Sequence, residues 1–341
     1  MGDDTRGDLH PCGGARTSLP PMDAGIYDVP VDPSAPNNVH AMTLRFVGSS
    51  KRVLEVGCAS GHVTRALVAQ GNTVIGVEID PEAAKTAAEH AERVVVGDLE
   101  VMDLDVELGD DRFDVVVLGD VLEHLRDPLP VLRSARRLLA PKGFIVISVP
   151  NVAHVDVRLM LLSGRWDYRD LGLMDRTHLR FFTRASARKL LADAGLAVVD
   201  IDRVVVPAFA TELGVDADTV PSDIVGRLLE DPDAETYQFV IKAVADDADA
   251  ATSAALARLA ELDDELLRAD HGLALAHANL TRCEQENASL RAELSELRDR
   301  IPMLEEHSRA LHELLHSRSM RVLAPLRRVY GAVRRRLSTD A

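Results

Sequence analysis

Four acidic side chains lie in or just after short apolar runs, at the spacing of successive strands in an α/β fold. Glu55 precedes a glycine-containing turn, Glu78 ends TVIGVE, Asp98 follows RVVVG, and Asp120 ends FDVVVLGD. Parallel sheets present ligand-binding groups at the carboxyl ends of their strands, so the four acids are expected to meet in one crevice. Glu78, which follows Gly57 by 21 residues, is placed to accept hydrogen bonds from ribose hydroxyls.

The segment VLEVGCASGHVTRAL predicts a strand, a tight turn and then a helix. Gly57 and Gly61 allow the backbone to approach a ligand, and the start of the helix offers unpaired N–H groups to a carboxylate or phosphate. A nicotinamide-binding GxGxxG motif needs glycines where Ala59 and His62 stand. The dinucleotide interpretation therefore loses two of its three glycines.

The elements that must position these residues follow from the alternation of β-branched runs and helical stretches after Lys51, which predicts a parallel sheet with crossover helices. Strands are expected at residues 52–56, 73–79, 93–97, 113–121, 144–151, 197–206 and 237–244. Helices are expected at residues 62–70, 81–92, 128–139 and from an N-cap at Thr183 to Ala194, with Pro141-Lys142-Gly143 as a turn that ends the third. The predicted fold is a Rossmann-like, seven-stranded, mostly parallel sheet with helices on both faces, followed by a long helical coiled-coil tail.

Taken together, these motifs resemble those of class I methyltransferases that use S-adenosylmethionine (SAM), over roughly residues 40–245. The resemblance implies SAM as the cofactor and an antiparallel last strand. It also implies a set of site residues: Glu55, Gly57, Cys58 and Gly61 around the methionine part of SAM, Glu78 at the ribose, Asp98 and Leu99 at the adenine, and Asp120 near the transferred methyl group. Ala59 departs from the commonest glycine-rich form of the motif.

Two further segments narrow the resemblance. LGDVLEHLRDP with LLAPKGFIVISVPN resembles the branch of ubiquinone-pathway and bacterial glycan-associated methyltransferases, and MDRTHLRFFT resembles a segment of the glycan-associated group. We expect an O-methyltransferase acting on a sugar, nucleotide sugar or glycan precursor in surface-polysaccharide biosynthesis. The alternatives are an O-methyltransferase for a small, quinone-like metabolite, and an inactive methyltransferase-fold scaffold that acts through its coiled coil.

Proton removal from the acceptor is assigned to histidines in loops above the sheet, because imidazole titrates near neutral pH. We predict His178, Asp175 and His124 as catalytic residues, with Asp175 orienting the His178 imidazole. The residues predicted to bind the acceptor are Arg176, Arg180, His154, Trp166 and Tyr168. The alternative is a structural role, in which His124 holds its loop and ion pairs hold a lid around His178.

Composition sets the limits. The chain has 341 residues, 46% of them apolar, and a net charge of −16, which argues against nucleic-acid binding because phosphate contacts require Lys and Arg. Cys12, Cys58 and Cys283 show no CxxC spacing, so neither a disulfide framework nor a zinc site is expected, and we assign no metal. Without a long apolar run or a basic-then-apolar N-terminus, we expect a cytoplasmic protein.

Four regions are expected: a flexible N-terminus at residues 1–25, the methyltransferase domain at 26–245, a coiled-coil helix at 246–315 and a basic amphipathic tail at 316–341. Heptad a positions run from Leu259 to Leu315, and their flanking charges favour a parallel homodimer over a single helix folded back on the domain. Pro302 predicts a kink or break. The tail, with seven Arg against Asp340, is expected to bind a protein partner or the inner face of the membrane.

Overall fold

The protein is described here by a computed structural model that covers residues 31–246, 250–316 and 328. It divides into two units, residues 1–271 and 272–341. The predictions for the N-terminus at residues 1–25, and those for the basic tail apart from residues 316 and 328, lie outside the described residues. None of the helices within the described ranges combines the length and the apolar character that a membrane crossing requires.

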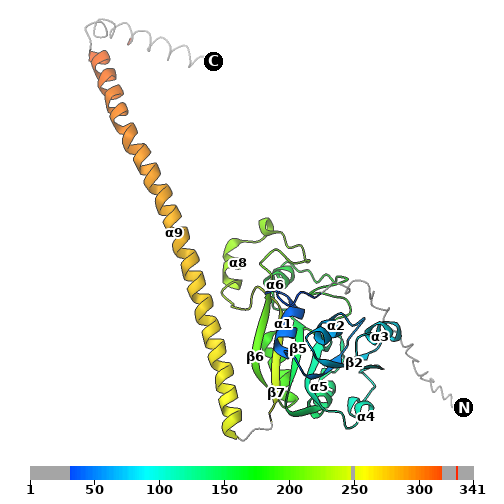
Figure 1. The fold of residues 1–341 in the computed structure, drawn as a ribbon. Helices are drawn as coiled ribbons and strands as arrows, with labels where there is room; N and C mark the ends of the chain where they lie inside the picture. The colour runs from blue at the N-terminus through cyan, green and yellow to red at the C-terminus, as the bar shows by residue number, and fades with distance from the viewer. Residues whose placement is uncertain (1–30, 247–249, 317–327, 329–341) are drawn as a thin grey trace, which may run out of the picture. The chain divides into compact units, whose positions relative to one another are not determined.

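A single sheet of seven strands organises the first unit (Figure 1). The strands lie in the order β3-β2-β1-β4-β5-β7-β6, and β7 runs antiparallel to both of its neighbours, as predicted. The strands are β1 Arg52–Val56, β2 Thr73–Glu78, β3 Arg93–Val96, β4 Phe113–Gly119, β5 Leu139–Pro150, β6 Leu196–Val205 and β7 Thr236–Ala245.

One strand starts earlier than predicted. β5 begins at Leu139, so the expected turn at Pro141-Lys142-Gly143 lies inside it. The register between β4 and β5 shifts there, because Phe113 pairs with Leu139 whereas Val115 pairs with Phe144. Lys142 has a φ of 67°, and a Cβ on Gly143 would lie 2.8 Å from the Phe113 carbonyl oxygen. The turn signal was correct, but the chain makes a bulge there and stays in the sheet.

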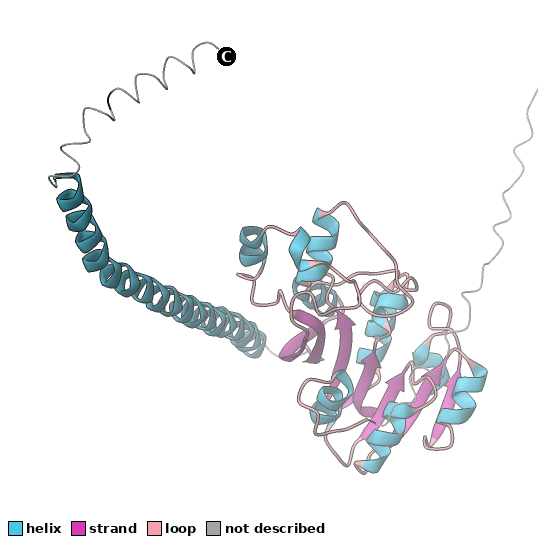
Figure 2. Ribbon diagram, turned by 90° about the horizontal axis from the view of Figure 1, so that it is seen from above, coloured by secondary structure: helices cyan, strands magenta, loops and turns pink. Residues whose placement is uncertain are grey.

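Helices cover both faces of the sheet (Figure 2). One apolar core joins the sheet to α4, α5 and α7, and a second joins the opposite face to α1 and α2. The helices of the first unit are α1 Val39–Val47, α2 His62–Ala69, α3 Pro81–Ala87, α4 Leu104–Leu108, α5 Pro128–Arg137, α6 Val155–Leu162, α7 Arg184–Asp193 and α8 Ser222–Leu228, with short 3₁₀ turns η2 Leu122–His124 and η3 Ala217–Thr219. The predicted N-cap Thr183 is confirmed: it forms a reciprocal capping box with Ser186.

A third apolar cluster lies beyond the carboxyl ends of β5 and β6. It contains Val155, Met160 and Met174 from one stretch of chain and Leu213 and Ala234 from another. We call the two stretches that form it, residues 151–182 and 206–235, the cap. Because both leave the sheet at its carboxyl edge, the cap places the predicted catalytic segment over the edge where ligand-binding groups meet.

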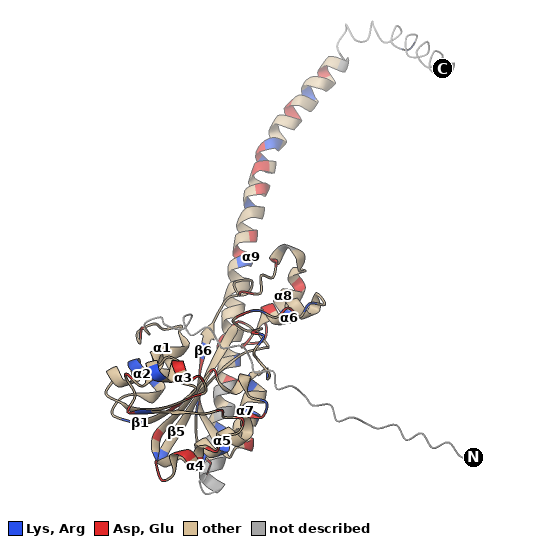
Figure 3. Ribbon diagram, turned by 90° about the vertical axis from the view of Figure 1, so that its right-hand side faces the viewer, with Lys and Arg blue, Asp and Glu red and all other residues tan. Residues whose placement is uncertain are grey.

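α9 extends from Ala250 to His316 as one helix of 67 residues. The expectation was a kink or a break at Pro302; the helix is continuous through this residue, so it does not break there, and the kink stays a prediction. Its heptad leucines are largely exposed in the single chain, for example Leu280 at 57% and Leu294 at 66%. Acidic and basic residues are interspersed along it (Figure 3). The helical tail is confirmed, and its pairing into a coiled coil stays a prediction.

Candidate active site

The turn after β1 is shaped by its glycines. Gly57 has a φ of 74° and Gly61 a φ of 85°, which other residues adopt only with strain. A Cβ on Gly57 would lie 2.6 Å from the Val121 side chain, and one on Gly61 would lie 2.7 Å from the Ala87 backbone. The glycines therefore let this turn pack closely against its neighbours while bringing its backbone to the sheet edge.

The turn leads into a helix whose first N–H groups receive no side-chain cap. Most neighbouring helices are capped by their own side chains, namely by Asn38, Asp80, Asp103, Asp127, His154 and Thr183. For α2, which follows the left-handed Gly61, no side chain of the described residues does so. Its N-terminus can therefore bind a ligand carboxylate, as predicted for the methionine end of SAM.

Glu78 holds the next position along the edge. Its carboxylate is buried and accepts the Ala59 N–H at 2.8 Å and the Ile79 and Asp80 N–H groups at 2.9 Å. These bonds fix the carboxylate against the turn after β1. Oε1 accepts two of the three N–H groups, whereas Oε2 accepts one and retains a lone pair for a further donor. The geometry suits the predicted contact with ribose hydroxyls.

Glu55 faces inward. Its carboxyl is buried and accepts a hydrogen bond from the Thr64 hydroxyl of α2 at 2.5 Å. Burial raises the pKa of Glu55 to about 8, partly offset by this bond. Cys58 is also buried, its Sγ packs toward Gly76, and burial raises the pKa of its thiol. Both residues therefore stabilise the turn through their side chains, and Cys58 can meet a cofactor only through its backbone.

Asp98 and Leu99 follow β3. The Asp98 carboxylate accepts the Glu100 N–H at 2.9 Å, and Leu99 packs, partly buried, against the main core. The Gly97 N–H donates to the Glu78 carbonyl at 2.9 Å, which links this turn to the preceding one. We call the turn after β1, Glu78 and residues 98–99 the cofactor side of the edge.

Asp120 directly follows β4, at the boundary of the cofactor side. It has a φ of 53° and accepts hydrogen bonds from the hydroxyl of Ser148 on β5 at 2.9 Å and from the amide of Gln238 on β7. Burial raises the pKa of Asp120, and the Ser148 bond and the charges of His40 and His124 oppose the rise. Asp120 is thus anchored by three strands at the centre of the edge.

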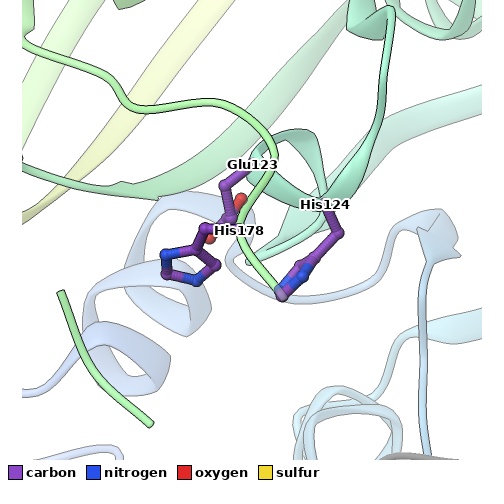
Figure 4. Close-up of side chains that lie close together, drawn as sticks. All are labelled: Glu123, His124 and His178. Carbon is purple, nitrogen blue, oxygen red and sulfur yellow. The ribbon is translucent and has the colours of Figure 1, made fainter. Parts of the chain in front are cut away.

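Glu123, His124 and His178 lie close together (Figure 4), and the charge of Asp120 acts on both Glu123 and His124. Each offers one oxygen or ring nitrogen, and the three atoms lie within 4.8 Å of one another. Glu123 is 1% exposed and His178 is 9% exposed. Burial raises the pKa of Glu123, whereas burial, helped by His124, lowers the pKa of His178 to about 4. We call Asp120–His124 with residues 175–180 the acceptor side.

Asp175 is hydrogen-bonded to Thr177, and its charge also acts on His178, the histidine with which it was predicted to pair. Its Oδ1 accepts the backbone N–H of Thr177 at 2.7 Å and its hydroxyl at 2.6 Å. The Thr177 hydroxyl oxygen and carbonyl oxygen lie 3.2 and 3.3 Å from His124 Nδ1. Since both oxygens accept there, His124 carries its proton on Nδ1 and exposes a lone pair on Nε2. Asp175 therefore orients His124 through Thr177.

The residues predicted to bind the acceptor are engaged elsewhere or lie at the surface. His154 is fully buried; its Nδ1 accepts the Asp156 N–H and its Nε2 donates to the Val206 carbonyl, which leaves no ring nitrogen for a substrate. Arg176 pairs with Asp170 at 2.8 Å, and Arg180 donates to the Arg126 carbonyl. Trp166 and Tyr168 are 40% and 54% exposed, and Trp166 packs edge-on against Phe181.

Sequence reasoning missed two residues of this site. Glu123, next to His124, was not among the predicted site residues. A carboxylate within an apolar run is rarely buried without a reason and could have indicated a functional group. His40 lies on α1, in a segment where no helix was predicted. Its ring lies edge-on to His62 at 4.9 Å, and its charge interacts with Asp120. The Asn38 N-cap before an apolar stretch could have revealed the helix that carries it.

The match to a known protein family falls within the first unit of the chain. Residues 35–201 match a family described as a methyltransferase domain. The chain is 30% identical over 167 residues to a ubiquinone biosynthesis O-methyltransferase of Psychrobacter arcticus, covering 48% of this chain and 65% of the relative. A protein with the same description from Cereibacter sphaeroides is 30% identical over 151 residues, covering 44% and 61%. The chain thus spans less than two thirds of the length of these relatives.

Solved structures similar to this chain include a SAM-dependent methyltransferase from Archaeoglobus fulgidus, with 21% identity, 60% of this chain and 92% of that chain covered, and a TM-score of 0.45. Another is a Burkholderia thailandensis 1,6-didemethyltoxoflavin-N1-methyltransferase with bound S-adenosylhomocysteine, at 23% identity, 62% and 78% coverage and a TM-score of 0.40.

Proposed function

Because residues 35–201 form a class I methyltransferase domain, whose methyl donor is SAM, we propose that this protein transfers the SAM methyl group to a hydroxyl of a small molecule. One observation carries the proposal: the cofactor side and a group of proton-accepting side chains meet at the same edge. The contact is direct, since Val121 packs against Gly57, next to Asp120.

SAM supplies an electrophilic methyl group on a sulfonium, and the residues of this chain bind and orient it. The uncapped N-terminus of α2 binds the carboxylate of its methionine part, and Glu78 accepts hydrogen bonds from its ribose. Methyl transfer is an in-line displacement, so most of the acceleration comes from holding the acceptor oxygen and the methyl group in line.

A hydroxyl acceptor loses its proton as the new C–O bond forms. His124 Nε2 is the group we assign to accept that proton, because Thr177 holds the other ring nitrogen in its protonated form. Asp120 lies close enough for its charge to interact with His124 and can stabilise the imidazolium that results. His178, whose pKa is lowered to about 4, stays neutral near pH 7 and can contact the acceptor without adding charge.

The choice of acceptor rests on the two arginines. An anionic acceptor such as a nucleotide sugar is bound best by a partly buried guanidinium, whereas Arg176 and Arg180 are exposed, the first paired with Asp170 and the second donating to the Arg126 carbonyl. A small, uncharged hydroxylated metabolite is therefore the acceptor class we favour. The ubiquinone-pathway description of the relatives agrees with this class. A sugar or glycan acceptor remains the second candidate, carried by the resemblance of MDRTHLRFFT alone.

The test begins with calorimetric titration of the full chain with SAM and S-adenosylhomocysteine. Wild type is expected to bind both, and Glu78→Gln to bind each roughly 10- to 100-fold more weakly, because a hydrogen bond to a charged group contributes about 1.5–3 kcal/mol. Glu82→Gln, a 79% exposed acid at the start of α3, serves as the control and should bind like wild type. Absence of binding to folded wild type would overturn the proposal and favour a scaffold.

The acceptor class is tested by measuring S-adenosylhomocysteine formation with matched panels of phenolic metabolites and nucleotide sugars. Turnover of the first panel supports the proposal. Turnover of the second panel alone, with a KM that rises on Arg176→Ala, would move the assignment to sugar acceptors.

We also propose that α9 pairs two chains. The apolar heptad positions of α9 are exposed in the single chain, including Leu290 at 60% and Leu294 at 66%. In a parallel pair, Glu286 would face Arg291 of the second copy and Glu293 would face Arg298. Leu290→Lys with Leu294→Lys should convert the dimer to a monomer in sedimentation equilibrium, while Ala292→Lys on the outer face should not. A monomeric wild type contradicts the pairing.

A further inference from the structure

The two ring nitrogens of His178 are in different surroundings. The ring lies beside that of His124, 5.0 Å away between centroids (Figure 4). It hydrogen-bonds to the Leu173 backbone, and this bond opposes the fall in the pKa of His178, as a bond to a carbonyl acceptor does. Nδ1 is buried and has no hydrogen-bond partner among the described residues. Neutral imidazole carries its proton on the nitrogen that donates, so Nε2 bears the proton and Nδ1 presents a lone pair.

The orientation of His178 therefore depends on the Leu173 backbone, which a carboxylate from the other stretch of the cap holds. Glu212 lies 39 residues further along the chain, and its Oε1 accepts the Leu173 N–H at 2.7 Å. Its Oε2 accepts the hydroxyl of Tyr237, on β7, at 3.1 Å. Burial raises the pKa of the Tyr237 hydroxyl, which therefore keeps its proton and donates. Glu212 thus ties Leu173 to the sheet.

The residue before Leu173 leaves room for this contact. Gly172 has a φ of 91°, which other residues adopt only with strain. A Cβ on Gly172 would overlap Oε1 of Glu212 and would lie 2.8 Å from the Tyr237 hydroxyl oxygen. A side chain at this position would therefore displace the carboxylate from the Leu173 N–H. The Leu173 side chain is 1% exposed, so packing fixes the residue as well.

We propose that Glu212 is a positioning residue for methyl transfer, which acts through the Leu173 backbone to orient His178. The Nδ1 lone pair of His178 then accepts a hydrogen bond from the acceptor, a role that rests on the proposed function. Glu212 itself contacts neither cofactor nor acceptor in this arrangement. One carboxylate can accept donors from two separate elements, which an amide or a hydroxyl does less well. Glu212 thus does for His178 what Asp175 does for His124.

The ring of His178 can be observed without turnover. Its nitrogen-15 NMR shifts, assigned by their loss in His178→Asn, are expected to show the proton on Nε2 in wild type near pH 7. Glu212→Ala removes both hydrogen bonds and should give a mixture of the two tautomers. Glu212→Gln keeps an amide oxygen for the Leu173 N–H and should restore the wild-type shifts. The matched control is Glu235→Ala, because Glu235 also accepts a backbone N–H of the cap, that of Ala208 at 2.9 Å; its shifts should match wild type.

Steady-state kinetics with a neutral acceptor and saturating SAM distinguish positioning from a general structural role. Glu212→Ala is expected to raise the KM for the acceptor about 3- to 10-fold with a smaller change in kcat, as for the loss of one hydrogen bond. In a His178→Asn background, the same change should have little further effect, because residues that act through one another are not additive. Fully additive losses in this cycle would overturn the proposal.

A wild-type tautomer in folded Glu212→Ala would also overturn it. If that variant does not fold by circular dichroism, Tyr237→Phe decides, because it removes one hydroxyl and should shift the tautomers of His178 in the same direction to a smaller extent; wild-type shifts there contradict the proposal. A chain that shows the expected tautomers but transfers no methyl group refutes the proposed function and supports the orientation by Glu212. Turnover with unchanged tautomers refutes the positioning role alone.

Discussion

The cofactor side and the acceptor side of the sheet edge are held in different ways. On the cofactor side, Glu78 accepts three backbone N–H groups, two of them from the residues that follow it. On the acceptor side, His124 is oriented by Thr177, 53 residues further along the chain. The first arrangement is local and follows from the strand and turn pattern, while the second requires the cap to fold back over the sheet. Local contacts therefore shape the cofactor side, and long-range contacts shape the acceptor side.

The largest expected effect separates the two sides by function. His124→Asn removes the assigned proton acceptor, so the rate of methyl transfer should fall about 10²- to 10⁴-fold. Since His124 lies on the acceptor side, the affinity for SAM should stay near the wild-type value. Steady-state kinetics and calorimetric titration on the same preparation measure both quantities. A loss of SAM affinity as large as the loss of rate would show that the two sides are not independent.

The second prediction concerns the turn on the cofactor side. Gly61→Ala places a Cβ 2.7 Å from the Ala87 backbone at a φ of 85°. Left-handed strain of about 1–2 kcal/mol and overpacking of about 1–3 kcal/mol should together lower the free energy of unfolding by about 2–5 kcal/mol.

Gly71 provides the matched control, because it has the same φ of 85° and no atom within 4 Å of an added Cβ. Gly71→Ala should show the strain alone, about 1–2 kcal/mol, in the same denaturant unfolding experiment. Equal losses for the two variants would mean that close packing does not explain Gly61.

The third prediction uses the buried carboxyl of Glu55. Its pKa is raised to about 8 in the folded protein from the ordinary value of 4.5, so between these values the folded state binds the extra proton. This contribution to stability is present below pH 4.5 and is lost as the pH rises toward 8, by up to about 1.4 kcal/mol per pH unit.

Glu55→Gln removes that titration. The free energy of unfolding of the variant, measured from pH 5 to 8, should fall less steeply with pH than that of wild type, and SAM affinity should change little. An unchanged slope would show that Glu55 is ionised in the folded protein. A large loss of SAM affinity would instead assign its carboxyl to the cofactor, as the family resemblance implies.

The smallest effect is expected at the outer rim of the acceptor side. Arg176 is 64% exposed and pairs with the 82% exposed Asp170, and exposed ion pairs contribute about 0–1 kcal/mol. Arg176→Ala should leave the unfolding free energy within about 1 kcal/mol of wild type and the kinetics with a neutral acceptor nearly unchanged. A large rise in KM for that acceptor would place Arg176 in the binding site.

Much of the cofactor side was predictable from single segments. A strand ending in Glu78 and a turn through Gly57 and Gly61 have local signals, because period, turn chemistry and helix caps depend on neighbours in the chain. His154 shows where such reasoning fails. As a histidine in a predicted loop it was assigned to the acceptor, but the fold buries it between Asp156 and Val206. No local pattern distinguishes a buried helix cap from a substrate contact.

The sequence by itself determined the seven-stranded sheet and, in most cases, the bounds of its strands to within a residue or two. Through the family resemblance it also determined the antiparallel last strand and the class of cofactor. Only the tertiary structure decided which side chains meet at the proposed acceptor side: that Asp175 reaches His124 through Thr177, that Glu123 and His40 lie near Asp120 and His124, and that Arg176 and Arg180 are already paired. The physical reason is that burial and pairing of polar groups depend on contacts between segments far apart in the chain, which hydrophobic periodicity does not encode.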